Sequence, residues 1–276
     1  MKLPFVKMHG IGNDFVLIEN TSRGLDLDVD QIRLIADRRR GVGCDQLIMT
    51  EPPRDGIADV RARIFNQDGS EAQQCGNGLR CLAVWLRDLG MVSGDSIRIE
   101  AGEDVVCARF EANRTVKLDM GVPRFDPRDV PFLAAERAEA YLLQVGARRV
   151  EIGAVSMGNP HAVTRVDDCA AAPVEELGAT IQALEAFPEG VNVGFMQVVD
   201  EATIRLRVFE RGVGETLACG SGACAAVVVG RMRGWLGARV SVGLPGGNLE
   251  VDWKGEGEPV WLTGPTQRSF EGELDL

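Results

Sequence analysis

The stretch Thr216-Leu-Ala-Cys219-Gly-Ser-Gly-Ala-Cys224 decides the fold of this chain, because its outline occurs twice. The segment Cys219-Gly-Ser-Gly222 matches Cys75-Gly-Asn-Gly78 at an offset of 144 residues. Self-similarity at a fixed offset indicates a repeated structural unit. We therefore expect each half of the chain to present one cysteine directly before a Gly-x-Gly sequence that opens a helix.

Two further blocks support the repeat. At the same offset, four residues of the second half match four of the first: Arg205, Arg207, Phe209 and Glu215 match Arg61, Arg63, Phe65 and Glu71. Upstream the offset is 146, where Gly158-Asn159 matches Gly12-Asn13 and Asn192 matches Gln46. Three blocks in the same order indicate an internal duplication, and 276 residues suit two domains of roughly 130 residues each.

Composition excludes several classes of function. Hydrophobic residues make up 45% of the chain and charged residues 26%, which is ordinary for a globular protein. The net charge of −11 argues against binding to nucleic acid or to an anionic membrane surface. No apolar run approaches the roughly 20 residues of a membrane span, and residues 1–7 lack the apolar region of a signal peptide. Seven cysteines, an odd number, favour reduced thiols and a cytoplasmic location.

Periodicity predicts an α+β fold. Residues 58–65 alternate between apolar and polar, as a half-buried strand does, and residues 203–209 repeat the alternation. Residues 79–89 and 223–229 are apolar on nearly all sides, which predicts one buried helix in each half. We expect two pseudo-symmetric domains from the duplication, each a mixed β-sheet or barrel wrapped around its central buried helix.

The domain boundaries follow from the repeat and from one linker. Residues 121–127, Gly-Val-Pro-Arg-Phe-Asp-Pro, are the best linker candidate. We expect an N-terminal domain at 1–120 and a C-terminal domain at 121–264, with the active site in the cleft between them. Residues 265–276 have no counterpart in their own half, so we expect them to complete the N-terminal domain.

The chemistry of a cysteine at a helix N-terminus follows from the helix dipole and the unpaired N–H groups. Both stabilise a thiolate and lower the thiol pKa from about 8.5 towards neutrality. The same N–H groups form a pocket for a carboxylate. Gly76, Gly78, Gly220 and Gly222 have no side chains that would cover these groups. Inversion of a stereocentre by proton exchange needs a base on one face of the carbon and an acid on the other. Cys75 and Cys219 supply such a pair, one as thiolate and one as thiol.

Seven stretches carry a family resemblance: His9-Gly-Ile-Gly-Asn-Asp-Phe15, Arg39-Arg-Gly-Val-Gly-Cys-Asp-Gln46, Phe65-Asn-Gln-Asp-Gly-Ser70, Gln74-Cys-Gly-Asn-Gly-Leu-Arg80, Met157-Gly-Asn-Pro-His161, Val191-Asn-Val-Gly194, and Phe209 through Cys224. The chain resembles diaminopimelate epimerase, the cofactor-independent isomerase of lysine biosynthesis and peptidoglycan precursor supply. The resemblance runs from near residue 5 to Gly264-Pro265 and so covers essentially the whole chain.

The resemblance implies a role for each matched residue. Cys75 and Cys219 would be the catalytic acid–base pair, and Glu210 would bind the reacting amine and, with His161, tune the thiols. The remaining implied ligands of the substrate are the backbone at Gly76, Asn77, Gly220 and Ser221, and the side chains of Asn13, Gln46, Asn66, Asn159, Asn192 and Arg211. The family is also homodimeric, and Phe270 stands where a tyrosine is often found at the subunit contact.

The same residues admit other interpretations. Free cysteines are usually small buried hydrophobes, and we assign that role to Cys44, Cys81, Cys107, Cys169 and Cys224. Two histidines and no C-x-x-C pair argue against a metal. The four lysines lie outside every motif, so we expect no pyridoxal phosphate and no other cofactor. A formal dinucleotide fingerprint at 220–225 lacks the acidic residue that should follow it.

The sequence therefore predicts an isomerase that converts LL-2,6-diaminopimelate, a small-molecule substrate, to the meso form by two-base proton transfer. One enzyme alternative is a racemase of proline or hydroxyproline type, which shares the two-cysteine plan. Asn77 and the Glu210-Arg211 pair favour diaminopimelate, because a cyclic imino acid has no distal amino-acid group for an arginine to hold. The other alternative is a non-catalytic redox module whose two cysteines form a regulatory disulfide.

Overall fold

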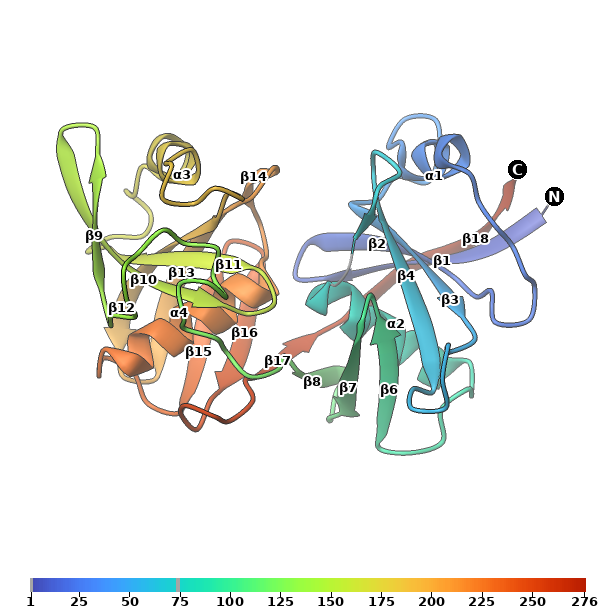
Figure 1. Ribbon diagram of the computed structural model, residues 1–276. Helices are drawn as coiled ribbons and strands as arrows, with labels where there is room; N and C mark the ends of the chain where they lie inside the picture. Colours follow the sequence, from blue (N-terminus) through green and yellow to red (C-terminus); the bar gives the residue numbers. More distant parts are fainter. Residues whose placement is uncertain (1, 73–74) are drawn as a thin grey trace. The chain divides into compact units, whose positions relative to one another are not determined.

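The computed structural model describes residues 2–72 and 75–276 of the chain, so Gln74 of the quoted motif lies outside the described residues. The chain divides into two compact units. Unit 1 comprises Met1–Asp119 and Thr263–Leu276, and unit 2 comprises Met120–Leu262. Each unit is described by itself (Figure 1).

Unit 1 is built on a mixed sheet. Its strands are β1 (Lys2–Gly10), β2 (Asn13–Ile18), β3 (Gln46–Glu51), β4 (Val60–Asn66), β5 (Glu71–Ala72), β6 (Ser96–Ala101), β7 (Asp104–Phe110) and β8 (Thr115–Asp119). β1 pairs antiparallel with β2, and β2 pairs parallel with β3. β3 and β4 are antiparallel, whereas β4 and β6 are parallel. Antiparallel pairs of β6 with β7 and of β7 with β8 follow.

Unit 2 repeats this pattern of pairings. Its strands are β9 (Tyr141–Val145), β10 (Arg148–Ser156), β11 (Pro160–Arg165), β12 (Asn192–Asp200), β13 (Thr203–Glu210), β14 (Gly214–Thr216), β15 (Arg239–Leu244) and β16 (Gly247–Asp252), and β17 (Trp261–Pro265) leads back into unit 1. From β10 to β16 the successive pairs are again antiparallel, parallel, antiparallel, parallel and antiparallel. The registers agree as well, because Phe15 lies opposite Gln46 and His161 lies opposite Asn192. The predicted α+β fold with an internal duplication is confirmed.

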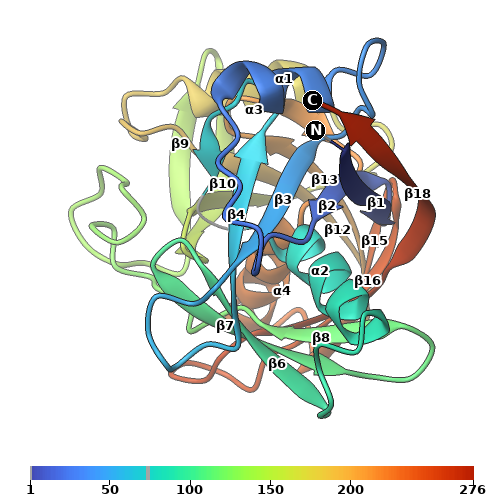
Figure 2. The same ribbon diagram turned by 90° about the vertical axis from the view of Figure 1, so that its right-hand side faces the viewer.

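Each unit holds one central helix. α2 (Gly76–Asp88) packs against β1, β2, β3, β7 and β8, and the strands surround it in both views of the ribbon (Figure 1, Figure 2). α4 (Gly220–Met232) packs against β10 to β13 and β16. Both helices begin at the glycine after the cysteine, three residues earlier than the apolar runs predicted. The buried surface of α2 is not entirely apolar, because the side chain of Arg80 is also fully buried.

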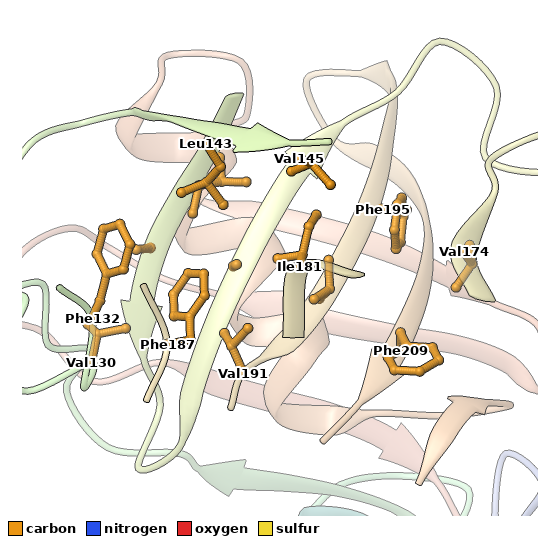
Figure 3. Close-up of a cluster of buried hydrophobic side chains, with 14 of the residues drawn as sticks. Val130, Phe132, Leu143, Val145, Val174, Ile181, Phe187, Val191, Phe195 and Phe209 are labelled. Atoms are coloured by element: carbon orange, nitrogen blue, oxygen red, sulfur yellow. The ribbon is translucent and has the colours of Figure 1, made fainter. Parts of the chain in front are cut away.

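A second, amphipathic helix covers another part of each sheet and encloses a separate core. α1 (Val29–Ala36) starts with a capping box formed by Asp28 and Gln31. In unit 2, α3 (Val174–Gln182) contributes Ile181 to a cluster that includes Phe132 and Phe187, whose rings stack at 4.7 Å (Figure 3).

The C-terminal strand belongs to unit 1. β18 (Gln267–Asp275) runs antiparallel to β1 over its whole length, from Lys2 opposite Asp275 to His9 opposite Gln267. One irregularity of register separates Lys7 from Met8. Among the described residues, the helices are all too short or too polar to span a membrane.

Candidate active site

A tight turn introduces the first candidate side chain in each unit. Gly12 and Gly158 have φ values of 92° and 88°, a left-handed conformation that side chains other than glycine rarely adopt. Each glycine directly precedes a candidate asparagine, Asn13 or Asn159. The matched Gly-Asn pairs thus mark the same backbone geometry in both units.

The two cysteines occupy the N-cap positions of α2 and α4. Cys75 has φ −147° and ψ 102°, and Cys219 has φ −127° and ψ 106°, so both backbones are extended where the helix begins. Neighbouring side chains pack closely against the second glycine of each Gly-x-Gly sequence. A Cβ atom at Gly78 would lie 2.5 Å from the Ile48 side chain, and one at Gly222 would lie 3.1 Å from Cys219 Sγ.

In unit 1 the structure brings Asn13, Cys75 and Asn77 together. Cys75 Sγ lies 3.8 Å from Asn13 Oδ1, and Asn77 Nδ2 donates to the same oxygen at 3.2 Å. Gln46 and Asn66 form a second polar pair, since neighbouring strands place them opposite each other. Gln46 Nε2 donates to Asn66 Oδ1 at 2.9 Å.

In unit 2 the thiol of Cys219 contacts a carboxylate. Its Sγ donates to Glu210 Oε2 at 3.3 Å, and Glu210 is in turn hydrogen-bonded by the Thr216 hydroxyl. Burial, and then the charge of Glu210, raise the pKa of Cys219 well above its usual value, against smaller lowering effects of the Gly222 N–H and the Ser221 hydroxyl. The expectation that the helix N-terminus lowers the thiol pKa is therefore wrong for Cys219. Desolvation and a neighbouring anion outweigh the helix dipole there.

His161 is held next to the same site through Asn159. Its Nε2 lies 2.9 Å from Asn159 Oδ1, and Asn159 Nδ2 donates to Ser221 Oγ at 3.4 Å. Ser221 Oγ is 3.8 Å from Cys219 Sγ. Burial, and to a lesser extent the charge of Arg211, lower the pKa of His161 to about 3. The imidazole is therefore neutral at neutral pH and donates its Nε2 proton to the amide oxygen.

Asn192 and Arg211 form a neighbouring pair. Asn192 Oδ1 accepts from the backbone N–H of Arg211 at 2.9 Å, and its Nδ2 donates to the carbonyl of Pro160 at 3.1 Å. The Arg211 side chain donates to the carbonyl of Glu189 at 3.0 Å. Both amide ends of Asn192 thus fix the strand ends around Arg211.

Three residues that contact the candidates were not themselves predicted from the sequence. Asp45 Oδ2 accepts from Asn13 Nδ2 at 2.8 Å, Arg80 Nη2 donates to Asn77 Oδ1 at 2.7 Å, and the Thr216 hydroxyl donates to Glu210. All three lie inside the quoted motifs, but their partners depend on tertiary contacts that spacing does not reveal.

Cys44, Cys81, Cys169 and Cys224 are buried core residues as predicted, and burial raises the pKa of Cys44 to about 11 and that of Cys81 to about 12. The prediction is wrong for Cys107, which is only half-buried. Within residues 2–72 and 75–276, no group of three or more His, Cys, Asp and Glu side chains is placed to hold a metal ion.

Comparison with known proteins gives the family. The family model described as diaminopimelate epimerase matches residues 5–125 and 153–269. The chain belongs to the diaminopimelate epimerase family. The resemblance inferred from the motifs is thereby confirmed, and membership of this family makes the chain an amino-acid isomerase with a small-molecule substrate.

Relatives match over the full chain. Diaminopimelate epimerases of Chromobacterium violaceum and Nitrosomonas europaea are each 52% identical over 276 residues, with 100% of both chains covered. That of Alkalilimnicola ehrlichii is 53% identical over 278 residues, again with complete coverage.

Among solved structures, the fold is shared more widely than the sequence. A hydroxyproline epimerase from Agrobacterium vitis with bound trans-4-hydroxy-L-proline superposes with a TM-score of 0.70 at 17% identity, covering 99% of this chain and 92% of the other. A PhzF-family phenazine biosynthesis protein from Bacillus anthracis gives a TM-score of 0.70 at 15% identity, covering 100% of both chains. These likenesses concern the fold alone.

Proposed function

We propose that the chain converts LL-2,6-diaminopimelate to the meso isomer through Cys75 and Cys219, without a cofactor. The observation that carries this proposal is the equivalent position of the two cysteines, each at the N-cap of a central helix in its own unit. Family membership indicates the substrate, because the three relatives at 52–53% identity described above are all named diaminopimelate epimerase.

Chemically, one thiolate removes the α-proton from one face of the reacting carbon while the other thiol donates a proton to the opposite face. No net change of atoms or charge occurs in the substrate, and the two sulfurs exchange roles in the reverse reaction. We assign Cys219 the role of initial proton donor. The burial and the Glu210 contact that favour its protonated form support this assignment.

The substrate's charges dictate the remaining roles. The carboxylate at the reacting carbon accepts hydrogen bonds from backbone N–H groups around Gly76-Asn77 and Gly220-Ser221. These groups lie at the starts of α2 and α4, where helix dipoles favour an anion. Glu210 pairs with the reacting ammonium group, and Arg211 holds the distal carboxylate in a bidentate way. Five amide side chains complete the proposed binding set: Asn13, Gln46, Asn66, Asn159 and Asn192. His161, which is buried and neutral, tunes the thiols together with Glu210.

The test is proton exchange in D₂O. Reduced, metal-stripped protein is incubated with LL-diaminopimelate in the absence of pyridoxal phosphate, and the meso isomer and α-deuterium are followed together. We expect deuterated meso product from the wild type and none from Cys75→Ala or Cys219→Ala. Exchange with proline or hydroxyproline alone would redirect the assignment to a racemase. Absence of exchange with any amino acid would favour the remaining alternative, a non-catalytic thiol redox module.

We further propose that the protein is a cytoplasmic homodimer joined through unit 1. Phe270 on β18 is 49% exposed and meets the Phe5 ring edge-on at 6.0 Å. Beside it is a cavity of about 640 Å³ whose lining includes Trp85 and Met91, at the opposite end of α2 from Cys75. Light scattering after gel filtration tests this proposal: Phe270→Asp should yield monomer, and an unchanged mass would place the contact elsewhere.

A further inference from the structure

Four side chains of unit 1 form a continuous hydrogen-bonded series whose two ends differ in chemistry. Arg80 Nη2 donates to Asn77 Oδ1 at 2.7 Å, and Asn77 Nδ2 donates to Asn13 Oδ1 at 3.2 Å. Asn13 Nδ2 then donates to Asp45 Oδ2 at 2.8 Å. A guanidinium can only donate and a carboxylate can only accept, so the series has a fixed direction.

The direction of the series decides which end of Asn13 faces the thiol. A carboxamide carries an oxygen that accepts and a nitrogen that donates, and a half-turn about its last bond exchanges them. Asp45 binds the nitrogen of Asn13, which leaves Oδ1 at 3.8 Å from Cys75 Sγ. At the other end of the series, Arg80 donates to Asn77 Oδ1, so that Asn77 Nδ2 faces Asn13 Oδ1 and favours the same orientation of Asn13.

Asp45 is itself held by charged groups. Arg38 Nη2 donates to Asp45 Oδ1 at 2.8 Å, and the backbone N–H of Asp14 donates to Asp45 Oδ2 at 3.1 Å. Although burial opposes the effect, hydrogen bonds from Arg38 and Lys7 hold the pKa of Asp14 far below its usual range. Asp45 is therefore held directly by Arg38 and by the Asp14 backbone, and Asp14 is held in turn by Arg38 and Lys7.

Unit 2 shows that the fold alone does not impose this direction. The equivalent asparagine, Asn159, is turned the other way: its Oδ1 faces His161 Nε2 and its Nδ2 donates to Ser221 Oγ. At the offset of 146 residues, the counterpart of Asp45 is Val191, which offers no acceptor side chain. The carboxylate at position 45 is thus specific to the unit that carries Cys75.

We propose that Asp45 is a positioning residue for Cys75, turning Asn13 so that its oxygen rather than its nitrogen faces the thiol. An oxygen there accepts from S–H and disfavours the thiolate, whereas a nitrogen would donate to the thiolate and stabilise it. A less stabilised thiolate is a stronger base, which suits removal of a weakly acidic α-proton. The inference rests on the proposed role of Cys75, but its test requires no turnover.

The test is the pH profile of Cys75 alkylation by iodoacetamide, read by peptide mass spectrometry, with the half-buried thiol of Cys107 as internal reference. Asp45→Ala should move the Cys75 midpoint to lower pH by about 0.5 to 1, the worth of one hydrogen bond exchanged. Arg38→Gln, which loosens Asp45, should also lower the midpoint, by less. A pure charge effect would instead raise the midpoint when the cation is removed.

The matched control is the pair of Asp59 and Arg98. Asp59 accepts from the Arg98 side chain at 3.0 Å and from its backbone N–H at 2.8 Å, as Asp45 does from Arg38 and Asp14, but no described contact links it to the asparagines. Asp59→Ala and Arg98→Gln should leave the Cys75 midpoint unchanged. Opposite shifts for Asp45→Ala and Arg38→Gln, or no shift in either, would overturn the proposal. If the alkylation midpoints shift as expected but the wild type shows no proton exchange in D₂O, the proposed function is refuted and the positioning role of Asp45 is not.

Discussion

Replacement of His161 by glutamine should make unit 2 less sensitive to acid. Burial, followed by Arg211, lowers the pKa of His161 to about 3, whereas the unfolded chain has a pKa of about 6.5. At pH 5 the unfolded state therefore binds a proton that the folded state refuses, and stability falls as the pH drops through 6.5 towards 3. At about 1.36 kcal/mol per pH unit below 6.5, the loss between pH 7 and pH 5 is about 2 kcal/mol.

The assay is urea unfolding at pH 7 and at pH 5, followed by tryptophan fluorescence. Three of the four tryptophans, Trp235, Trp253 and Trp261, lie in unit 2 and report on it. His161→Gln alters packing equally at both values of pH. The quantity to compare is therefore the change in unfolding free energy between pH 7 and pH 5, measured for each protein. We expect the wild type to lose about 2 kcal/mol more than the variant, from the single buried proton site. Equal losses would refute the argument that burial keeps His161 neutral.

Three further predictions follow from the contacts of the structure. Glu210→Gln removes the anion beside Cys219, so the pKa of that thiol should fall and alkylation below its midpoint should accelerate at least about tenfold. Gly78→Ala places a methyl group 2.5 Å from a buried isoleucine side chain and should cost about 1–3 kcal/mol of unfolding free energy in urea titrations. Arg207→Ala breaks bonds to a glutamate and to three backbone carbonyls, and should cost about 2–3 kcal/mol in the same assay.

Each of these substitutions has a control in the chain. Glu201→Gln removes an exposed carboxylate on a turn and should leave Cys219 alkylation unchanged. Gly56→Ala introduces a methyl group with nothing within 4 Å, and Arg205→Ala removes an exposed arginine from the same strand as Arg207. Controls that destabilise as much as their partners would show that the named contacts are not the cause.

The duplication was predictable because both copies keep the same turn and cap chemistry. Glycine with a positive φ before Asn13 and Asn159, and cysteine before Gly-x-Gly, are requirements of local backbone geometry and therefore visible in sequence. The buried helices were predictable for a similar reason, since an apolar surface on all sides leaves only an interior position.

The polar network was not predictable in the same way. Arg80 is fully buried although arginine normally indicates a surface position, and its acceptor Asn77 lies one turn earlier on the same helix. The raised pKa of Cys219 arises from tertiary burial and from Glu210, nine residues away along the chain. Local sequence indicated the helix dipole correctly, but carried no measure of the desolvation that outweighs it.

The pairing of β18 with β1 has a consequence for the order in which the protein matures on the ribosome. Unit 2 occupies a continuous stretch, Met120–Leu262, so all of its strands have been synthesised before β18 exists. Unit 1 begins first, but β1 pairs only with β2, and its other edge has no partner strand until Gln267–Asp275 emerges. Since domains generally fold as units during synthesis, the copy encoded second completes its sheet before the copy encoded first. Until β18 emerges, this exposed edge of β1 is a site that a chaperone would have to protect.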